Sequence, residues 1–136
     1  MSKRIYIDSN IYLDYFQART DSIKPLDEIA FQLFKRTISC EFEIVLSDWV
    51  LIEMKKYVTA EQIGFLTDEL TQKNKLILVE MLDFEIKQAK LISKNWRDFV
   101  HVLIAKRTNC ELIVTRNIIH FEEFNSLLQS ELSENI

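Results

Sequence analysis

The segment Arg4-Ile5-Tyr6-Ile7 runs directly into the polar triplet Asp8-Ser9-Asn10, and this junction determines the fold that we expect. A short apolar run rich in β-branched residues is typical of a strand that is buried on both faces. Three similar runs follow along the chain, at residues 43–46, 75–79 and 111–114. Strands that alternate with helices indicate a mostly parallel sheet covered by helices on both faces. The expected fold is therefore α/β, with three α/β/α layers and a central sheet of four or five strands.

The stretches between these runs carry apolar residues at helical spacing. The stretch after Pro25 is one example, with a single apolar face made of Leu26, Ile29, Ala30, Leu33 and Phe34. Residues 99–105 are apolar at every position except His101, which predicts a central helix covered on all sides. The last dozen residues, 125–136, predict a short terminal helix or a frayed tail. We expect one domain over residues 1–136.

The composition excludes several classes of protein. A chain of 136 residues is about the size of one domain. It has one glycine, Gly64, and one proline, Pro25. Phosphate-binding loops and dinucleotide-binding fingerprints need two or three closely spaced glycines, so neither motif is present. The scarcity of Gly and Pro turns also argues against an all-β sandwich or barrel.

Cysteine usage and charge bear on location and partners. Cys40 and Cys110 are far apart in the sequence, and neither has a second Cys or a His at metal-ligand spacing. This favours a reduced, cytoplasmic protein without structural zinc. No apolar run approaches the roughly eighteen residues of a membrane span, so we expect no association with a membrane. The net charge of −4 argues against binding nucleic acid through bulk charge alone.

Three acidic residues follow the expected strands. Asp8 ends the first strand, Glu53 lies in the helix after the second, and Asp98 opens the central helix. Ligands of open parallel sheets bind beyond the carboxyl ends of the strands, so we expect these carboxylates to converge there. Converging carboxylates repel one another unless a positive group lies among them, and Mg²⁺ or Mn²⁺ suits such oxygen ligands. Because a bound divalent ion can activate water, the inferred chemistry is phosphodiester hydrolysis.

Each of these residues also has a purely structural interpretation. Asp8 is well placed to cap the helix expected over residues 10–16. Glu53 has the character of a solvated helix residue, and Asp98 suits the first turn of a helix whatever else it does. His101 on an apolar helix is often a hydrogen-bonded core residue. The functional interpretation therefore depends on the combined position of the residues.

Four blocks of the sequence resemble, in the same order, the conserved blocks of the PIN domain. The PIN domain is the small metal-dependent ribonuclease fold of VapC-type toxins in type II toxin–antitoxin systems. The first is a strand ending in Asp8, and the second places Glu53 in a helix after a strand. The third is Asp98 followed by His101 and Ala105. The fourth is Leu112-Ile113-Val114-Thr115-Arg116-Asn117. The resemblance covers residues 6 to about 124.

The resemblance implies that Asp8, Glu53 and Asp98 hold Mg²⁺ or Mn²⁺ and act as the catalytic acids. It also implies that the hydroxyl of Ser9 or Thr115 orients a water molecule or a carboxylate. The further supporting residues are Asn10, His101, Asn117 and His120. Arg116 is the expected contact to the substrate, because it lies beside the site in the sequence.

The chain departs from the family pattern in its last block. Many members carry a fourth acid there, either at the position of Asn117 or three residues further on, where this chain has His120. A second metal ion would have fewer anionic ligands, so we expect one tightly held ion. The acids at Glu122 and Glu123 are the nearest replacements in the sequence.

Two functions follow from these observations. The first is a metal-dependent endoribonuclease, and one such role is the toxin of a type II toxin–antitoxin pair. Its partners would be RNA, an antitoxin protein and a second copy of the chain. We expect the antitoxin and the second copy to contact the first two helices. The alternative is a PIN-fold module with weakened or lost catalysis that acts in RNA binding or protein assembly. The intact set of Asp8, Glu53 and Asp98 favours the first, and Asn117 and His120 favour the second.

Overall fold

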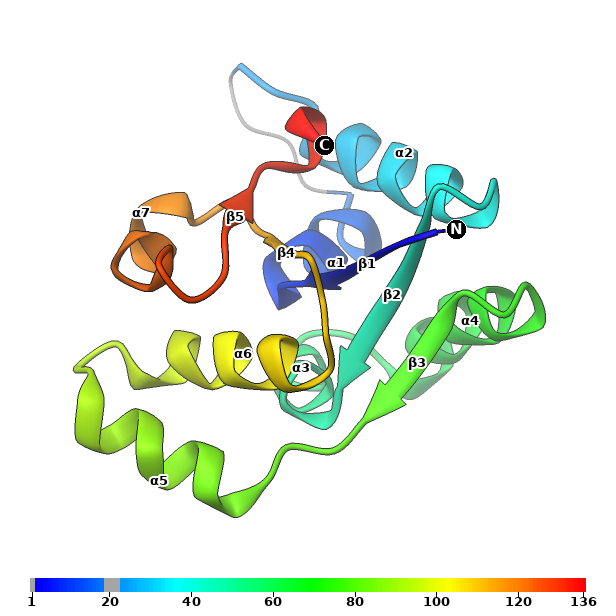
Figure 1. Ribbon diagram of the computed structural model, residues 1–136. Coiled ribbons are helices and arrows are strands. Elements are labelled where there is room, and N and C mark those ends of the chain that lie inside the picture. Colours follow the sequence, from blue (N-terminus) through cyan, green and yellow to red (C-terminus); the bar gives the residue numbers. More distant parts are fainter. Residues whose placement is uncertain (1, 19–22) are drawn as a thin grey trace.

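The computed structural model describes residues 2–18 and 23–136, which form a five-stranded sheet and its covering helices (Figure 1). The strand order is β3-β2-β1-β4-β5, and every neighbouring pair is parallel. The strands are β1 (Lys3–Ile7), β2 (Phe42–Ser47), β3 (Leu76–Val79), β4 (Leu112–Val114) and β5 (Ser130–Glu131). The predicted α/β fold with a parallel sheet is therefore confirmed.

Seven α-helices flank this sheet in the described residues. They are α1 (Ser9–Phe16), α2 (Leu26–Ile38), α3 (Asp48–Met54), α4 (Ala60–Gln72), α5 (Asp83–Ile92), α6 (Trp96–Arg107) and α7 (Ile118–Phe121). Helices α5 and α6 lie side by side on one face of the sheet, and α1 and α2 lie on the other (Figure 1). None of the helices in the described part of the chain is long and apolar enough to cross a membrane.

The core lies on both faces of the three central strands. Ile5, Tyr6 and Ile7 of β1 are fully buried, as strands covered on both faces require. In α6, six of twelve residues are buried, including His101. The prediction of a central, covered helix over 99–105 is thus confirmed. Burying a large apolar side chain contributes about 1.5–3 kcal/mol, so these central elements supply much of the stability.

Side-chain caps fix where the helices begin. The Asp8 carboxylate accepts a hydrogen bond from the backbone N–H of Ser9 at the start of α1. Ser47 caps α3 by accepting from the backbone N–H of Val50. These two caps place α1 and α3 directly after β1 and β2 and orient both helix starts toward one edge of the sheet.

The helices end without glycine. Residues with positive φ follow the last turns of four of them: Ala18 at 49° after α1, Cys40 at 73° after α2, Asn74 at 57° after α4 and Asn109 at 62° after α6. Asparagine tolerates this left-handed conformation better than most residues other than glycine. The chain therefore makes its αβ turns with other residues, which explains how an α/β fold forms with so little glycine.

The segment 125–136 is not the terminal helix that the sequence predicts. It contributes the short strand β5 and a 3₁₀ turn at Ser133–Asn135. The backbone N–H groups of Ile113 and Thr115 donate to the carbonyls of Gln129 and Glu131, each at 3.0 Å. Buried backbone donors on the open edge of β4 need acceptors, and this requirement outweighs the helical spacing of the segment.

A pair of leucine substitutions tests this description of the core. Leu70 of α4 is completely buried, whereas Leu91 of α5 is 88% exposed. We expect Leu70→Ala to lower the free energy of unfolding by about 2–5 kcal/mol, through lost burial and the cavity left behind. The matched Leu91→Ala should change it by less than about 0.5 kcal/mol. Urea denaturation followed by circular dichroism measures both, and equal losses would contradict this packing.

Candidate functional site

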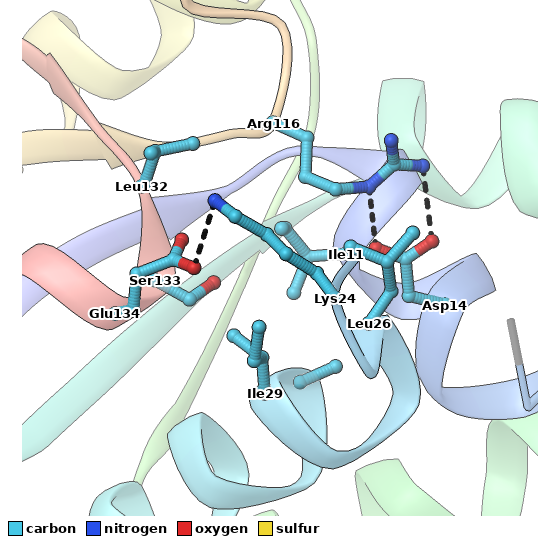
Figure 2. A pocket seen from close by; sticks show the side chains of 10 residues that line it. Ile11, Asp14, Lys24, Leu26, Ile29, Arg116, Leu132, Ser133 and Glu134 are labelled. Atoms are coloured by element: carbon cyan, nitrogen blue, oxygen red, sulfur yellow. Dashed lines mark hydrogen bonds and ion pairs between the residues drawn. The ribbon is translucent and has the colours of Figure 1, made fainter. Parts of the chain in front are cut away.

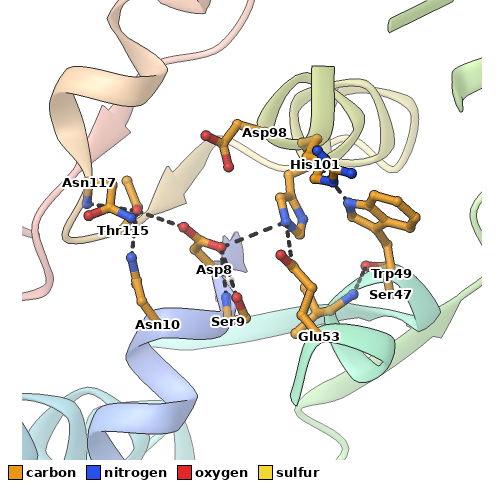
Figure 3. A network of polar contacts seen from close by, with 12 residues as sticks. Asp8, Ser9, Asn10, Ser47, Trp49, Glu53, Asp98, His101, Thr115 and Asn117 are labelled. Atoms are coloured by element: carbon orange, nitrogen blue, oxygen red, sulfur yellow. Dashed lines mark hydrogen bonds and ion pairs between the residues drawn. The ribbon is translucent and has the colours of Figure 1, made fainter. Parts of the chain in front are cut away.

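Polar side chains from separate segments meet at the carboxyl ends of the central strands (Figure 3). Asp8 follows β1, and Thr115 follows β4. Glu53 lies on α3 after β2, and His101 lies on α6. The strand order places β1 between β2 and β4, so the segments after these strands reach a common space. The site therefore lies where the ligands of open parallel sheets bind.

The ligand atoms of Asp8, Glu53 and His101 lie within 4.8 Å of one another. Nε2 of His101 is 2.8 Å from Oε1 of Glu53 and 3.7 Å from Oδ1 of Asp8. His101 is fully buried and the Asp8 side chain is almost so, whereas the Glu53 side chain is 33% exposed. Two of the three carboxylates that the sequence predicts to converge thus lie together at one partly open site.

Asp8 is held on both of its oxygens. Oδ1 accepts from the backbone N–H of Ser9 at 2.7 Å, with the Ser9 hydroxyl at 3.4 Å. Oδ2 accepts from the hydroxyl of Thr115 at 2.9 Å. The capping and the site interpretations of Asp8 therefore hold together, since one carboxylate begins α1 and also faces His101. Of the two hydroxyls expected to orient a water molecule or a carboxylate, that of Thr115 lies closer to Asp8, at 2.9 Å against 3.4 Å for Ser9.

His101 is held from behind by two residues that the sequence analysis did not single out. Nδ1 lies 2.6 Å from the hydroxyl of Tyr6, and that hydroxyl lies 2.7 Å from Oγ of Ser47. A signal existed for Tyr6, because residues two apart on a strand share a face and Tyr6 precedes Asp8 by two. Ser47 stands at the end of β2, where it also caps α3.

Charge at the site alters the pKa of the imidazole. Burial, the largest contribution, lowers the pKa of His101. The hydrogen bond that the imidazole donates to Glu53 and the negative charges of Asp8 and Glu53 raise it, and Asp98 adds to this effect. Together they outweigh burial and hold the pKa of His101 above its usual value. The carboxylates therefore lie close enough to the imidazole to favour its positively charged form.

Asp98 lies at the same opening but outside the tight group of Asp8, Glu53 and His101. Its carboxylate projects from the start of α6 toward the space above Asp8 (Figure 3). Burial raises the pKa of Asp98, and the charge of Asp8 raises it further. The two carboxylates therefore repel each other across the gap, which a cation between them would relieve.

The remaining residues of the last block lie around this opening. The backbone N–H of Asn117 donates to Oγ1 of Thr115 at 3.0 Å, and Nδ2 of Asn10 lies 3.4 Å from the same hydroxyl. His120 is largely exposed, and its Nδ1 lies 3.8 Å from Oδ2 of Asp98. Asn117 and Asn10 therefore meet at Thr115, while His120 faces Asp98.

Arg116 has a different environment from the one that the sequence predicts. Its guanidinium donates to both oxygens of Asp14, at 2.6 and 3.0 Å, and Asp14 is almost fully buried. The pair lies on the wall of a cavity of about 210 Å³ between α1, α2 and the C-terminal residues (Figure 2). This bidentate pair ties the β4–α7 connection to α1, which favours a structural role over contact with substrate.

The donor atoms present fit a small hard divalent cation. Asp8, Glu53 and Asp98 supply carboxylate oxygens, the ligands that Mg²⁺ and Mn²⁺ prefer. The thiols of the chain are at Cys40, which is exposed, and Cys110, which is buried. Neither belongs to the group of potential ligands at the site. That group consists of the carboxylates of Asp8 and Glu53 and the imidazole of His101, with the Asp98 carboxylate at the same opening, so most of the donors are carboxylate oxygens.

The arginine environment gives one test. We expect Arg116→Lys to lower the free energy of unfolding by about 2 kcal/mol, because lysine keeps the charge but cannot bind Asp14 through two parallel hydrogen bonds. The control is Arg36→Lys, which alters a similar bidentate pair whose Glu41 side chain is 50% exposed. That change should cost less than about 1 kcal/mol. Equal stability of the Arg116→Lys protein and the unmodified one would contradict the structural role.

The raised pKa of Asp98 gives a second test, in EDTA. A carboxyl whose pKa is higher in the folded than in the unfolded state costs stability once it ionises, so Asp98→Asn should raise the free energy of unfolding at pH 7. The gain should shrink as the pH falls through the pKa of Asp98, where the native carboxyl is neutral as well. Urea titrations between pH 3.5 and 7 measure this, with exposed Asp68→Asn as the control. A loss of stability at pH 7 would contradict the repulsion.

Comparison with known proteins bears on the fold. No family model matches the chain, and no curated protein matches it in sequence. Among solved structures, a chain of the crystal structure of VapBC2 from Rickettsia felis bound to a DNA fragment from their promoter is similar, with a TM-score of 0.60. The two are 16% identical, and the match covers 95% of this chain and 98% of that one. At this identity the likeness shows a shared fold over nearly the whole length, in agreement with a PIN-like architecture.

Proposed function

We propose that the protein is a metal-dependent endoribonuclease that hydrolyses phosphodiester bonds of RNA. The observation that carries this proposal is the convergence of Asp8 and Glu53 at the carboxyl ends of the strands, with Asp98 at the same opening. These acids come from three distant segments of the chain. The PIN-like fold supports the proposal. The same three acids lie in the sequence blocks by which this chain resembles VapC-type ribonucleases.

Mg²⁺ or Mn²⁺ would be held by Asp8, Glu53 and Asp98. A bound divalent ion can activate water and neutralise charge that develops on a phosphodiester. The protein's own contribution is to fix the carboxylates. Thr115 and the N–H of Ser9 hold Asp8, and His101 holds Glu53. Residues that hydrogen-bond to metal ligands and orient them have a strong effect on metal affinity. We therefore expect these contacts to affect metal binding as well as stability.

The loss of the fourth acid limits the site to fewer anionic ligands. Asn117 offers only neutral groups, and His120 lies beside Asp98 at 3.8 Å. Glu123, one of the two acids that could replace the missing one, accepts hydrogen bonds from the Ser93 hydroxyl at 3.2 Å on each oxygen. We therefore expect one tightly bound ion, with a second ion bound only weakly or through phosphate oxygens of the substrate.

Aromatic and cationic side chains beside the site support RNA as the substrate. The rings of Trp49 and Trp96 lie 6.1 Å apart, and Trp49 lies 6.5 Å from His101. Lys90 and Arg97 approach the Trp96 ring, with the Lys90 ammonium at 4.7 Å and the Arg97 guanidinium at 4.5 Å from its centre. Indole rings with cations nearby suit bases and phosphates of a single strand.

An antitoxin protein and a second copy of the chain are the proposed protein partners. Helices α1, α2 and α4 border two neighbouring hollows of about 280 and 330 Å³. Their apolar lining includes Tyr15, Phe16, Phe31, Phe34, Ile38, Phe65 and Leu66. The similar solved structure is that of VapBC2 bound to a promoter DNA fragment, which supports a partner of antitoxin type. The unpaired thiols of Cys40 and Cys110 support a cytoplasmic location.

The alternative is a PIN-fold module that has lost catalysis and serves in RNA binding or assembly. The observations that favour it are Asn117 in place of an acid and the pairing of Arg116 with Asp14. This alternative predicts an intact fold that binds RNA or a protein partner without cleaving RNA. It is separated from the first proposal by a cleavage assay.

The proposal is tested by incubating purified protein with labelled mixed-sequence RNA in Mn²⁺, Mg²⁺ or EDTA. We expect cleavage with either metal and none in EDTA. Asp8→Asn should reduce the rate at least about 100-fold, because it removes an anionic ligand from the metal. The matched control, Asp68→Asn, changes an exposed acid on α4 and should cleave at the unmodified rate.

Two outcomes would contradict the enzyme. Cleavage that persists in EDTA or in the Asp8→Asn protein would point to a contaminating nuclease. If the protein does not cleave RNA and calorimetry shows no Mn²⁺ binding, the binding module is favoured instead.

A further inference from the structure

The side chains behind the site form one continuous chain of hydrogen bonds. Oγ of Ser47 lies 2.7 Å from the Tyr6 hydroxyl, and that hydroxyl lies 2.6 Å from Nδ1 of His101. On the other side of the ring, Nε2 lies 2.8 Å from Oε1 of Glu53. Ser47, Tyr6 and His101 have no exposed surface, so Glu53 is the one member that solvent reaches.

The Glu53 carboxylate determines where the imidazole carries hydrogen. An ionised carboxylate only accepts hydrogen bonds. Nε2 lies 2.8 Å from the Glu53 oxygen and must therefore be an N–H donor. Without hydrogen, the lone pair of the nitrogen would repel the lone pair of the oxygen. Oδ1 of Asp8, at 3.7 Å from the same nitrogen, is beyond hydrogen-bond distance. A metal ion could bind Nε2 only by displacing this hydrogen and breaking the hydrogen bond to Glu53.

Tyr6 and Ser47 complete this arrangement. In the neutral imidazole with its hydrogen on Nε2, Nδ1 accepts from the Tyr6 hydroxyl, and the Ser47 hydroxyl donates to the Tyr6 oxygen. Oγ of Ser47 also accepts from the backbone N–H of Val50 at 3.2 Å, so every polar group has a partner. In the reverse direction Tyr6 would donate to Ser47, and the buried Ser47 hydroxyl would have no acceptor among the described residues. An unsatisfied buried donor is costly, which favours the first direction.

We propose that Tyr6 and Ser47 are positioning residues that hold His101 as a hydrogen-bond donor to Glu53, so that His101 is not a metal ligand and the metal site is built from carboxylates. This inference rests on the proposed function for its role in catalysis. The hydrogen on Nε2 is nevertheless a property of the metal-free protein. It can therefore be tested whether or not the protein cleaves RNA.

The first experiment measures the imidazole itself. His120→Gln leaves His101 as the sole histidine, because the chain has two. In this protein, labelled with ¹⁵N-histidine and free of metal, we expect NMR to show hydrogen on Nε2 and a slowly exchanging Nε2–H signal. Hydrogen on Nδ1 alone would overturn the proposal.

Two tyrosine variants in the same background test the positioning role. Tyr6→Phe removes the partner of Nδ1 and should abolish the slowly exchanging Nε2–H signal. The matched control is Tyr12→Phe, which removes a buried hydroxyl that has no hydrogen-bond partner among the described residues. That variant should keep the signal. An unchanged signal in Tyr6→Phe would overturn the role of Tyr6.

The second experiment uses Mn²⁺ and needs no tyrosine variant for its main result. Pulsed EPR of the Mn²⁺-loaded His120→Gln protein should show no coupling to a directly bound imidazole nitrogen, and such a coupling would overturn the proposal. By calorimetry, Tyr6→Phe should raise the Mn²⁺ dissociation constant about tenfold, while Tyr12→Phe leaves it unchanged. Absence of Mn²⁺ binding in the unmodified protein would instead contradict the proposed function, and the NMR result would still decide the state of His101.

Discussion

One buried imidazole joins the layers of this structure. His101 belongs to the central helix α6, while its partners Tyr6 and Glu53 belong to β1 and α3. A buried imidazole without partners would cost stability, so α6 packs well only where the Tyr6 hydroxyl and the Glu53 carboxylate both meet it. The same contacts that satisfy the core therefore bring α3 and its carboxylate to the end of β1. Packing and site geometry depend on each other here.

The topology of the sheet explains why Asp8 is central to the site. From β1 the chain proceeds to β2 and β3 on one side and then crosses to β4 on the other. The reversal of strand order lies between β1 and β4, and ligands of doubly wound sheets bind at such a point. Asp8 and Thr115 end these two strands and are joined by a 2.9 Å hydrogen bond. Asp8 also caps α1, so its position is fixed by secondary structure as well as by its partners.

Local patterns in the sequence predict what depends on local structure. The apolar runs identify the four longer strands, and Asp8 and Glu53 are found because they follow strands in the sequence. What the patterns miss depends on distant partners. Arg116 and Asp14 are 102 residues apart, so an arginine beside the site in sequence is held elsewhere in space. Tyr6 looks like an ordinary apolar strand residue, although its hydroxyl meets a helix 95 residues away. The strand β5 forms because an edge of β4 needs acceptors, and nothing within residues 125–136 signals that need.

The balance of charge links the missing fourth acid to the stability of the metal-free protein. Asp8, Glu53 and Asp98 share one opening, and the charge of Asp8 already raises the pKa of Asp98. A fourth carboxylate near Thr115 would add to this repulsion whenever no cation is bound. Asn117 occupies that region without charge, and His120 beside Asp98 lowers the pKa of that acid and so favours its ionised form. Asn117 and His120 therefore make the site less dependent on a cation for its stability. Under the proposed function, Asn117 and His120 leave fewer anionic oxygens for a second ion, and this is the basis for expecting a single metal there.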